Sequence, residues 1–210
     1  MRLGVAALAI SAVLWLSGCV TPPDYTNFFH YQPHSILVAT PANKTTAVDA
    51  PVVFLTTVSK AFAERGYYVF PTFLVHDILN DLGATDEEAI AAIPPVKFKE
   101  VFGADSILYI TITEWATSYV LLSATVTVGA QFRLVDASTG TVLWTREAKF
   151  VYQSGGGSLI GMAVSALLAT TVDYQPLALE LNSLAANPAG YGIPAGSYHP
   201  AFQKDREQFK

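Results

Sequence analysis

The stretch ATVTVGAQFRLVD (residues 124–136) alternates between two kinds of side chain along its length. One parity is apolar: Ala124, Val126, Val128, Ala130, Phe132 and Leu134. The other parity is largely polar: Thr125, Thr127, Gln131 and Arg133. Successive side chains of a strand point to opposite faces of a sheet. The alternation therefore predicts a strand with one buried face and one face that meets water or a partner.

The segments on either side of this strand predict an antiparallel meander. SILYITITEW (106–115) alternates in the same way, with Leu108, Ile110 and Ile112 on one parity. DASTG (136–140) is typical of a hairpin loop, and TVLWTREAKFVY (141–152) returns as the third strand. Trp144 has the inward parity of this third strand.

Aromatic residues on the outward parity predict an interaction surface, because Trp and Tyr are common anchors at protein interfaces. The predicted surface consists of Tyr109, Thr111, Thr113, Trp115 and Tyr119. The alternative is that these aromatic rings fill the core or pair across strands.

The first half of the chain predicts strands at 35–40 and 67–70, separated and followed by amphipathic helices. Asp49, Pro51 and Gly66 mark the ends of the first helix, and Gly83 ends the second. A last helix is expected at about 174–188. The predicted fold class is α/β, with a mixed sheet in the order β-α-β-α-β-β-β-α and helices mainly on one face. We expect one domain over residues 35–188.

LWLSGCVTPP (14–23) contains the single cysteine of the chain. Arg2 precedes about 14 apolar residues, which as a helix would span roughly 21 Å, short of the ~30 Å core of a bilayer. This is the pattern of a secretory signal. Its ending, Leu16-Ser17-Gly18-Cys19, resembles the bacterial lipobox.

The lipobox resemblance implies that residues 1–18 are a signal peptide, removed next to the lipidated Cys19. Leu16, Ser17 and Gly18 would form the signal-peptidase recognition site. Cys19 would carry a diacylglycerol and an N-acyl chain, and no other cofactor is expected. Val20, in place of the Asp of inner-membrane retention signals, favours the outer membrane, with the domain facing the periplasm. The alternative is an uncleaved anchor followed by an ordinary buried cysteine.

Residues 19–34 contain three prolines and lack a helical period, which predicts an extended tether reaching about 50 Å. Its aromatic cluster, Phe28 to Tyr31, is expected to dock on the domain, the alternative being the headgroup level. The Gly- and Pro-rich residues 189–210 predict an irregular tail that wraps the domain surface. Without residues 1–18 the chain has 17 acidic and 11 basic residues, a net charge of −6, which argues against nucleic-acid binding.

SLIGMAVSALLATTV (158–172) is free of charge but too short for an ordinary transmembrane helix. Gly161 and Ser165 have a small-xxx-small spacing that lets helices approach closely, so both belong to the predicted interaction surface. The alternatives are a buried packing helix, a membrane-inserting segment and part of an oligomeric pore.

The residues that could carry chemistry are scattered. The four histidines lack metal-ligand spacing, and SGGGSLIG (154–161) lacks the lysine of a phosphate-binding loop. We therefore expect no metal site and no catalytic residues. The alternative is an envelope hydrolase or transferase with a site assembled from residues such as His76, Asp105 and Ser158.

Several specific strings occur along the chain: Gly66-Tyr67-Tyr68-Val69 before Pro71, Phe102-Gly103-Ala104-Asp105, Trp115 with Tyr119, Leu134-Val135-Asp136 with Thr139-Gly140, Leu143-Trp144 and Tyr198-His199-Pro200. Together with the lipobox, they resemble a family of bacterial lipoproteins of unknown function, known from a meningococcal genome-derived surface antigen. Ala195-Gly196-Ser197 departs from the pattern, since a second proline is expected there.

The resemblance implies a fold similar to the N-terminal domain of TolB and to curli-secretion lipoproteins. It also implies a non-catalytic binding, scaffold or assembly role in the envelope, with another envelope lipoprotein or a second copy of the chain as partner.

Overall fold

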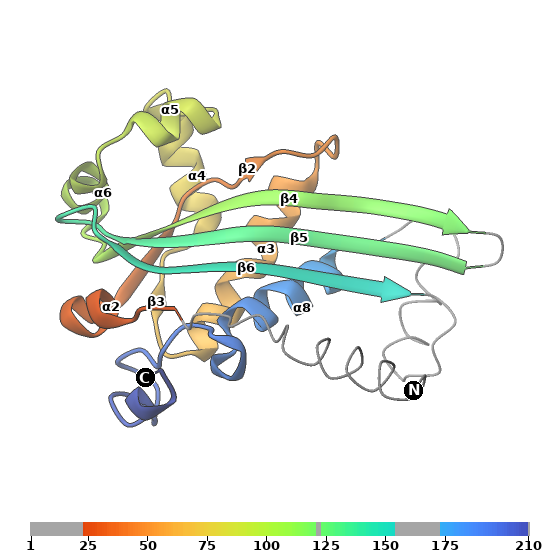
Figure 1. The fold of residues 1–210 in the computed structure, drawn as a ribbon. Helices are drawn as coiled ribbons and strands as arrows, with labels where there is room; N and C mark the ends of the chain where they lie inside the picture. Colours follow the sequence, from red (N-terminus) through yellow and green to blue (C-terminus); the bar gives the residue numbers. More distant parts are fainter. Residues whose placement is uncertain (1–22, 121–122, 154–172, 210) are drawn as a thin grey trace, which may run out of the picture.

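A six-stranded mixed sheet forms the centre of the computed structural model, which describes residues 23–120, 123–153 and 173–209 (Figure 1). Its strands follow the order β3-β1-β4-β5-β6, with β2 paired to β4. They are β1 (Ser35–Val38), β2 (Ala42–Asn43), β3 (Tyr68–Val69), β4 (Ser106–Val120), β5 (Ser123–Asp136) and β6 (Val142–Gln153). The sequence-based α/β class and the meander are confirmed.

Strand direction divides the sheet into two parts. β1 pairs in parallel with both β3 and β4, whereas β4, β5 and β6 pair antiparallel. The short β1 has four buried residues, SILV, because helices pack on both of its faces. The long meander strands keep the alternation of the sequence, except beyond a register shift in β4, since helices cover one face along most of their length.

Two helices, α3 (Ala50–Glu64) and α8 (Gln175–Ala186), cover the inner face of the meander. The rings of Phe54 and Phe62 from α3 lie 6.4 and 6.5 Å from that of Phe132 on β5. Trp144 on β6 lies edge-on to Phe62 at 6.1 Å, which confirms its inward orientation.

Three helices pack on the opposite face, around the beginning of β1 and β4. They are α4 (Thr72–Asp81), α5 (Glu87–Ala92) and α6 (Pro95–Phe102). Their buried residues, such as Leu79 and Phe98, form a second core with Leu37 and Ile107 of the sheet. The helices of the first half therefore cover both faces at this end, and a single face only in the rest of the meander.

The predicted extended tether is wrong for its second half, because Thr26–Tyr31 forms helix α2. Tyr25 and Phe28 are each 3% exposed and belong to the main core, so the docking of the aromatic cluster is confirmed. Tertiary burial of these rings, rather than helix propensity, stabilises so short a helix.

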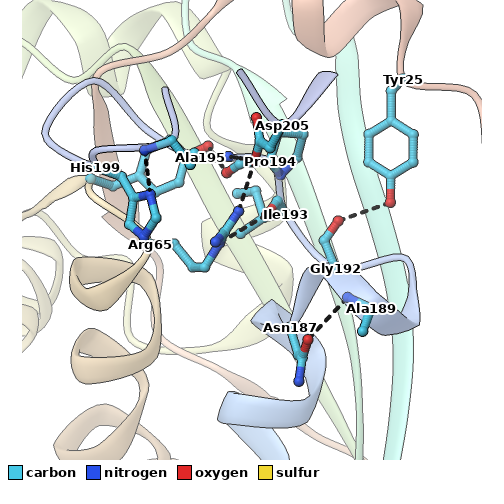
Figure 2. A network of polar contacts seen from close by, with 12 residues as sticks. Tyr25, Arg65, Asn187, Ala189, Gly192, Ile193, Pro194, Ala195, His199 and Asp205 are labelled. Carbon is cyan, nitrogen blue, oxygen red and sulfur yellow. Dashed lines mark hydrogen bonds and ion pairs between the residues drawn. The ribbon is translucent and has the colours of Figure 1, made fainter. Parts of the chain in front are cut away.

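The C-terminal tail folds over the end of α3, and two short 3-10 turns are its regular elements: η1 (Pro188–Gly190) and η2 (Arg206–Phe209). Arg65, which ends α3, donates from Nε to the carbonyl of Ile193 and from Nη2 to Asp205, both at 3.1 Å (Figure 2). Gly66 follows at φ +82°, where an added Cβ would lie 2.4 Å from the His199 nitrogen. Only glycine allows this close passage of the tail.

Within the described ranges, no helix combines the length and apolar character needed to cross a membrane. Segment 158–172 lies outside the described residues, as do Gly161 and Ser165.

Candidate interaction surface

The outer face of the meander presents six side chains in two rows. The register places Tyr109 of β4 opposite Arg133 of β5 and Arg133 opposite Thr145 of β6. Two residues further along, Thr111, Gln131 and Glu147 form the second row. These six residues, here called the outer groove, line a shallow depression of about 380 Å³. Tyr109 and Thr111 thus lie where the alternation of the sequence predicts.

Arg133 and Tyr109 hold each other in place. The guanidinium carbon of Arg133 lies 5.0 Å from the Tyr109 ring centroid, a cation–π contact. The same ring packs edge-on against Phe98 of α6 at 6.4 Å. Burial raises the pKa of the Tyr109 hydroxyl, against a smaller opposite effect of the Arg133 charge. Tyr109 is therefore a neutral hydrogen-bond donor at physiological pH.

A second, smaller depression of about 80 Å³ continues the outer groove towards α5. It shares Tyr109, Thr111 and Arg133 with the groove and adds Thr40 and Glu87 among its lining residues. Glu87 forms an exposed ion pair with Lys44 at 2.6 Å. The surface available to a partner therefore runs from β6 across the sheet to α5.

Arg133 on β5 and Glu147 on β6 place opposite charges on neighbouring strands of the outer groove. Neither has an ion-pair partner within the described part of the chain. Exposed, unpaired charges beside an aromatic ring suit a polar protein partner, because complementary charges fix register and specificity.

Trp115 does not lie on the outer face, and its sequence-based placement is wrong. The pairing of β4 with β5 shifts between Ile112 and Glu114, so Thr113 is the extra residue of a β-bulge. The bulge inverts the parity of the rest of β4, and Trp115 faces the core with 6% exposure. Its ring stacks on Tyr174 at 4.7 Å and 19°.

The sequence contains a signal for this bulge in Gly129, which pairs with Glu114. A Cβ at this position would lie 3.2 Å from both Glu114 Cβ and Thr113 Oγ1. Glycine within a strand often marks a bulge or a close approach. Beyond the bulge, Glu114 forms an ion pair with Lys149 of β6 at 2.7 Å.

The remaining predicted site residues divide into two groups. Thr113 is half-buried at the bulge. The Tyr119 side chain, the recognition residues Leu16, Ser17 and Gly18, and Cys19 lie outside what the structure describes.

The candidate hydrolytic residues do not form a joint site among the described residues. His76 forms hydrogen bonds through Nδ1 with Thr40 Oγ1 at 2.9 Å and through Nε2 with Asn80 Nδ2 at 3.1 Å. Asp105 accepts from the nitrogens of His34 and Ser35 and from the Ser35 hydroxyl, at 3.1–3.2 Å. Asp105 thus fastens the start of β1, whereas Ser158 lies outside the described residues. No group of metal-ligating side chains occurs among the residues that the structure describes.

Comparison with known proteins gives one family. The model of the family described as "Putative lipoprotein GNA1162-like" matches residues 23–185. A curated lipoprotein of Neisseria meningitidis serogroup B, NMB1124/NMB1162, is 38% identical over 167 residues, which cover 77% of this chain and 78% of the relative.

Solved structures include the crystal structure of lipoprotein GNA1162 from Neisseria meningitidis. It is 40% identical, has a TM-score of 0.55, and the match covers 65% of this chain and 96% of that one. The PelC dodecamer of Paraburkholderia phytofirmans is 16% identical with a TM-score of 0.47, over 78% of this chain and 89% of that one.

Proposed function

The chain belongs to the family of GNA1162-like lipoproteins, and on this premise we propose that it is a lipid-anchored, non-catalytic binding or assembly protein of the bacterial envelope. Acyl chains on Cys19 hold it in the outer membrane, and the domain faces the periplasm. The outer groove binds the partner, which is another envelope lipoprotein or a second copy of this chain.

The lipobox supports the anchor. Two or three acyl chains give stable membrane attachment where a single chain gives only marginal attachment. Mass spectrometry of the mature N-terminus tests this: residues 1–18 should be absent, and the mass of the diacylglycerol and N-acyl groups should be present on Cys19. Cys19→Ser should lose both changes and move the protein to the aqueous phase of a detergent partition. A variant that matures and partitions like the parent would refute the anchor.

The outer groove is the observation that carries the binding role. Tyr and Arg are both enriched among interface hot spots, and the groove presents one of each, joined by a cation–π contact. Its six residues come from three neighbouring strands, so a partner would meet a rigid surface that changes little on binding.

Site-specific photo-cross-linking in whole cells tests the groove. A photoreactive amino acid at Thr145, an exposed groove residue, should give adducts with an envelope protein or with a second copy. The matched control is Thr56, also an exposed threonine, on α3 on the other side of the sheet. Equal adduct patterns from Thr145 and Thr56, or none from Thr145, would contradict the proposed role of the groove. Arg133→Ala in the same strain should reduce the Thr145 adducts.

A further inference from the structure

Helix α2 belongs to the folded body, and this places a fixed point close to the anchor. Tyr25 donates its hydroxyl to the carbonyl of Gly192 at 2.8 Å (Figure 2), and its ring lies 4.7 Å from that of Phe209. The buried Phe28 adds a second fastening one turn later. The chain is therefore attached to the body from Tyr25 onwards.

The chain between the proposed anchor and this fixed point is short. Six residue steps separate Cys19 from Tyr25, and a fully extended chain of that length spans at most about 21 Å. The whole of residues 19–34, had it been free, would reach about 50 Å. The body consequently cannot stand far from the bilayer.

The fixed point lies at one end of the sheet. Asn27 of α2 donates from Nδ2 to the carbonyl of Val142 at 3.2 Å, where β6 begins. From Val142, β6 continues for eleven residue steps to Gln153, which at ~3.3 Å per residue is about 36 Å. Ser118 lies opposite Thr125, and Thr125 opposite Gln153, so Ser118 marks the far end of the meander. Figure 1 shows α2 at one end of the strands, with the end of β4 and the start of β5 at the other.

The exposed charges at the α2 end are nearly balanced. Lys204 and Arg206 are exposed cations, and the Arg206 guanidinium lies 4.9 Å over the Phe29 ring, whereas Asp24 and Glu207 are exposed anions. Asp205 is buried and paired with Arg65. This end therefore lacks the repulsion from anionic lipid that the net charge of −6 would otherwise produce, and its ammonium and guanidinium groups can bind lipid phosphates.

We propose that the surface formed by α2 and the C-terminal tail lies against the phospholipid headgroups, kept there by the short chain to Cys19, with the meander projecting away from the membrane. This inference rests on the proposed lipid anchor. It gives the proposed function a direction, because the far end of the meander reaches some 36 Å beyond the membrane-facing end when the strands stand upright.

Energy transfer to the membrane tests the orientation. The acylated protein is reconstituted in vesicles of phosphatidylethanolamine and phosphatidylglycerol that contain an acceptor lipid. A donor dye is attached to Gln208→Cys, in the tail, or to Ser118→Cys, at the far end; both residues are exposed. The thiol of Cys19 is acylated, so the introduced cysteine takes the dye. We expect strong loss of donor fluorescence at position 208 and much weaker loss at position 118.

A longer tether provides the second variant. Twelve Gly/Ser residues inserted between Pro22 and Pro23 leave every described contact in place and raise the maximal reach from about 21 Å to about 63 Å. The loss of donor fluorescence at position 208 should then largely disappear. Equal or greater transfer at position 118 in the parent, or undiminished transfer at position 208 with the linker, would overturn the proposal.

Flotation of the same samples separates this inference from its premise. Protein that is not acylated and does not float with the vesicles would show that the proposed anchor is wrong. Protein that is acylated and floats, but transfers no more strongly from position 208 than from position 118, would refute the orientation alone.

Discussion

Loss of the Asp205 carboxylate should destabilise the protein far more than loss of an exposed carboxylate in a shorter ion pair. Asp205 Oδ2 accepts from Arg65 Nη2 at 3.1 Å and from the backbone nitrogen of Ala195 at 2.7 Å. The side chains of Arg65 and Asp205 are 14% and 4% exposed. Asp205→Ala leaves both donors without this acceptor, one of them a charged group that is largely out of water.

Breaking a buried pair from one side costs about 3–5 kcal/mol of unfolding free energy, because the remaining charge stays uncompensated. With a urea m-value of about 2 kcal/mol/M, the midpoint of unfolding should fall by about 1.5–2.5 M. Glu100→Ala is the control: its pair with Lys97 is shorter, at 2.6 Å, but the two side chains are 54% and 58% exposed. Exposed pairs contribute about 0–1 kcal/mol, so Glu100→Ala should hardly move the midpoint.

The double variant Arg65→Met/Asp205→Leu tests the reason for the loss. If the cost of Asp205→Ala comes from the orphaned charge, removing both charges should cost less than removing one. The reasoning is refuted if Asp205→Ala loses no more stability than Glu100→Ala, or if the double variant is the less stable of the two Asp205 variants.

Three further predictions concern the core, the tail and the pH dependence. Trp115→Ala should lower the unfolding free energy by about 3–5 kcal/mol in urea titrations, because the ring is buried in the main core; a loss below 1 kcal/mol would place it on the outer face. Gly66→Ala should displace the tail and speed its proteolysis, whereas Gly83→Ala, at φ +85° with no atom within 4 Å, should cost only about 1–2 kcal/mol of backbone strain and leave the tail protected. Burial raises the pKa of Tyr25 to about 12, so the neutral hydroxyl stabilises the fold fully below pH 10, and this stability is lost as the pH rises towards 12. Tyr25→Phe should flatten that part of a stability–pH curve; an unchanged slope between pH 10 and 12 would contradict the assigned burial.

Alternation along the chain was enough to predict the meander and its inner face up to the bulge in β4. Ile110, Phe132 and Trp144 are buried where their parity predicts, because a strand with one helix-covered face must separate apolar from polar side chains at period two. The same pattern placed Tyr109 and Thr111 on the outer groove. It could not supply Arg133 and Glu147 as part of the same site, since cross-strand neighbours depend on register rather than on distance along the chain.

The tertiary structure alone decided those features that depend on contacts between distant parts of the chain. A single extra residue at Thr113, fitted against Gly129, turned Trp115 into the core, and parity counted along one strand cannot register an insertion relative to its neighbour. Helix α2 exists because Tyr25 and Phe28 find buried places beside Gly192 and Phe209, more than 160 positions away. Six residues have too little intrinsic helix stability for their sequence to predict a helix, so only the packing against the tail makes this segment helical.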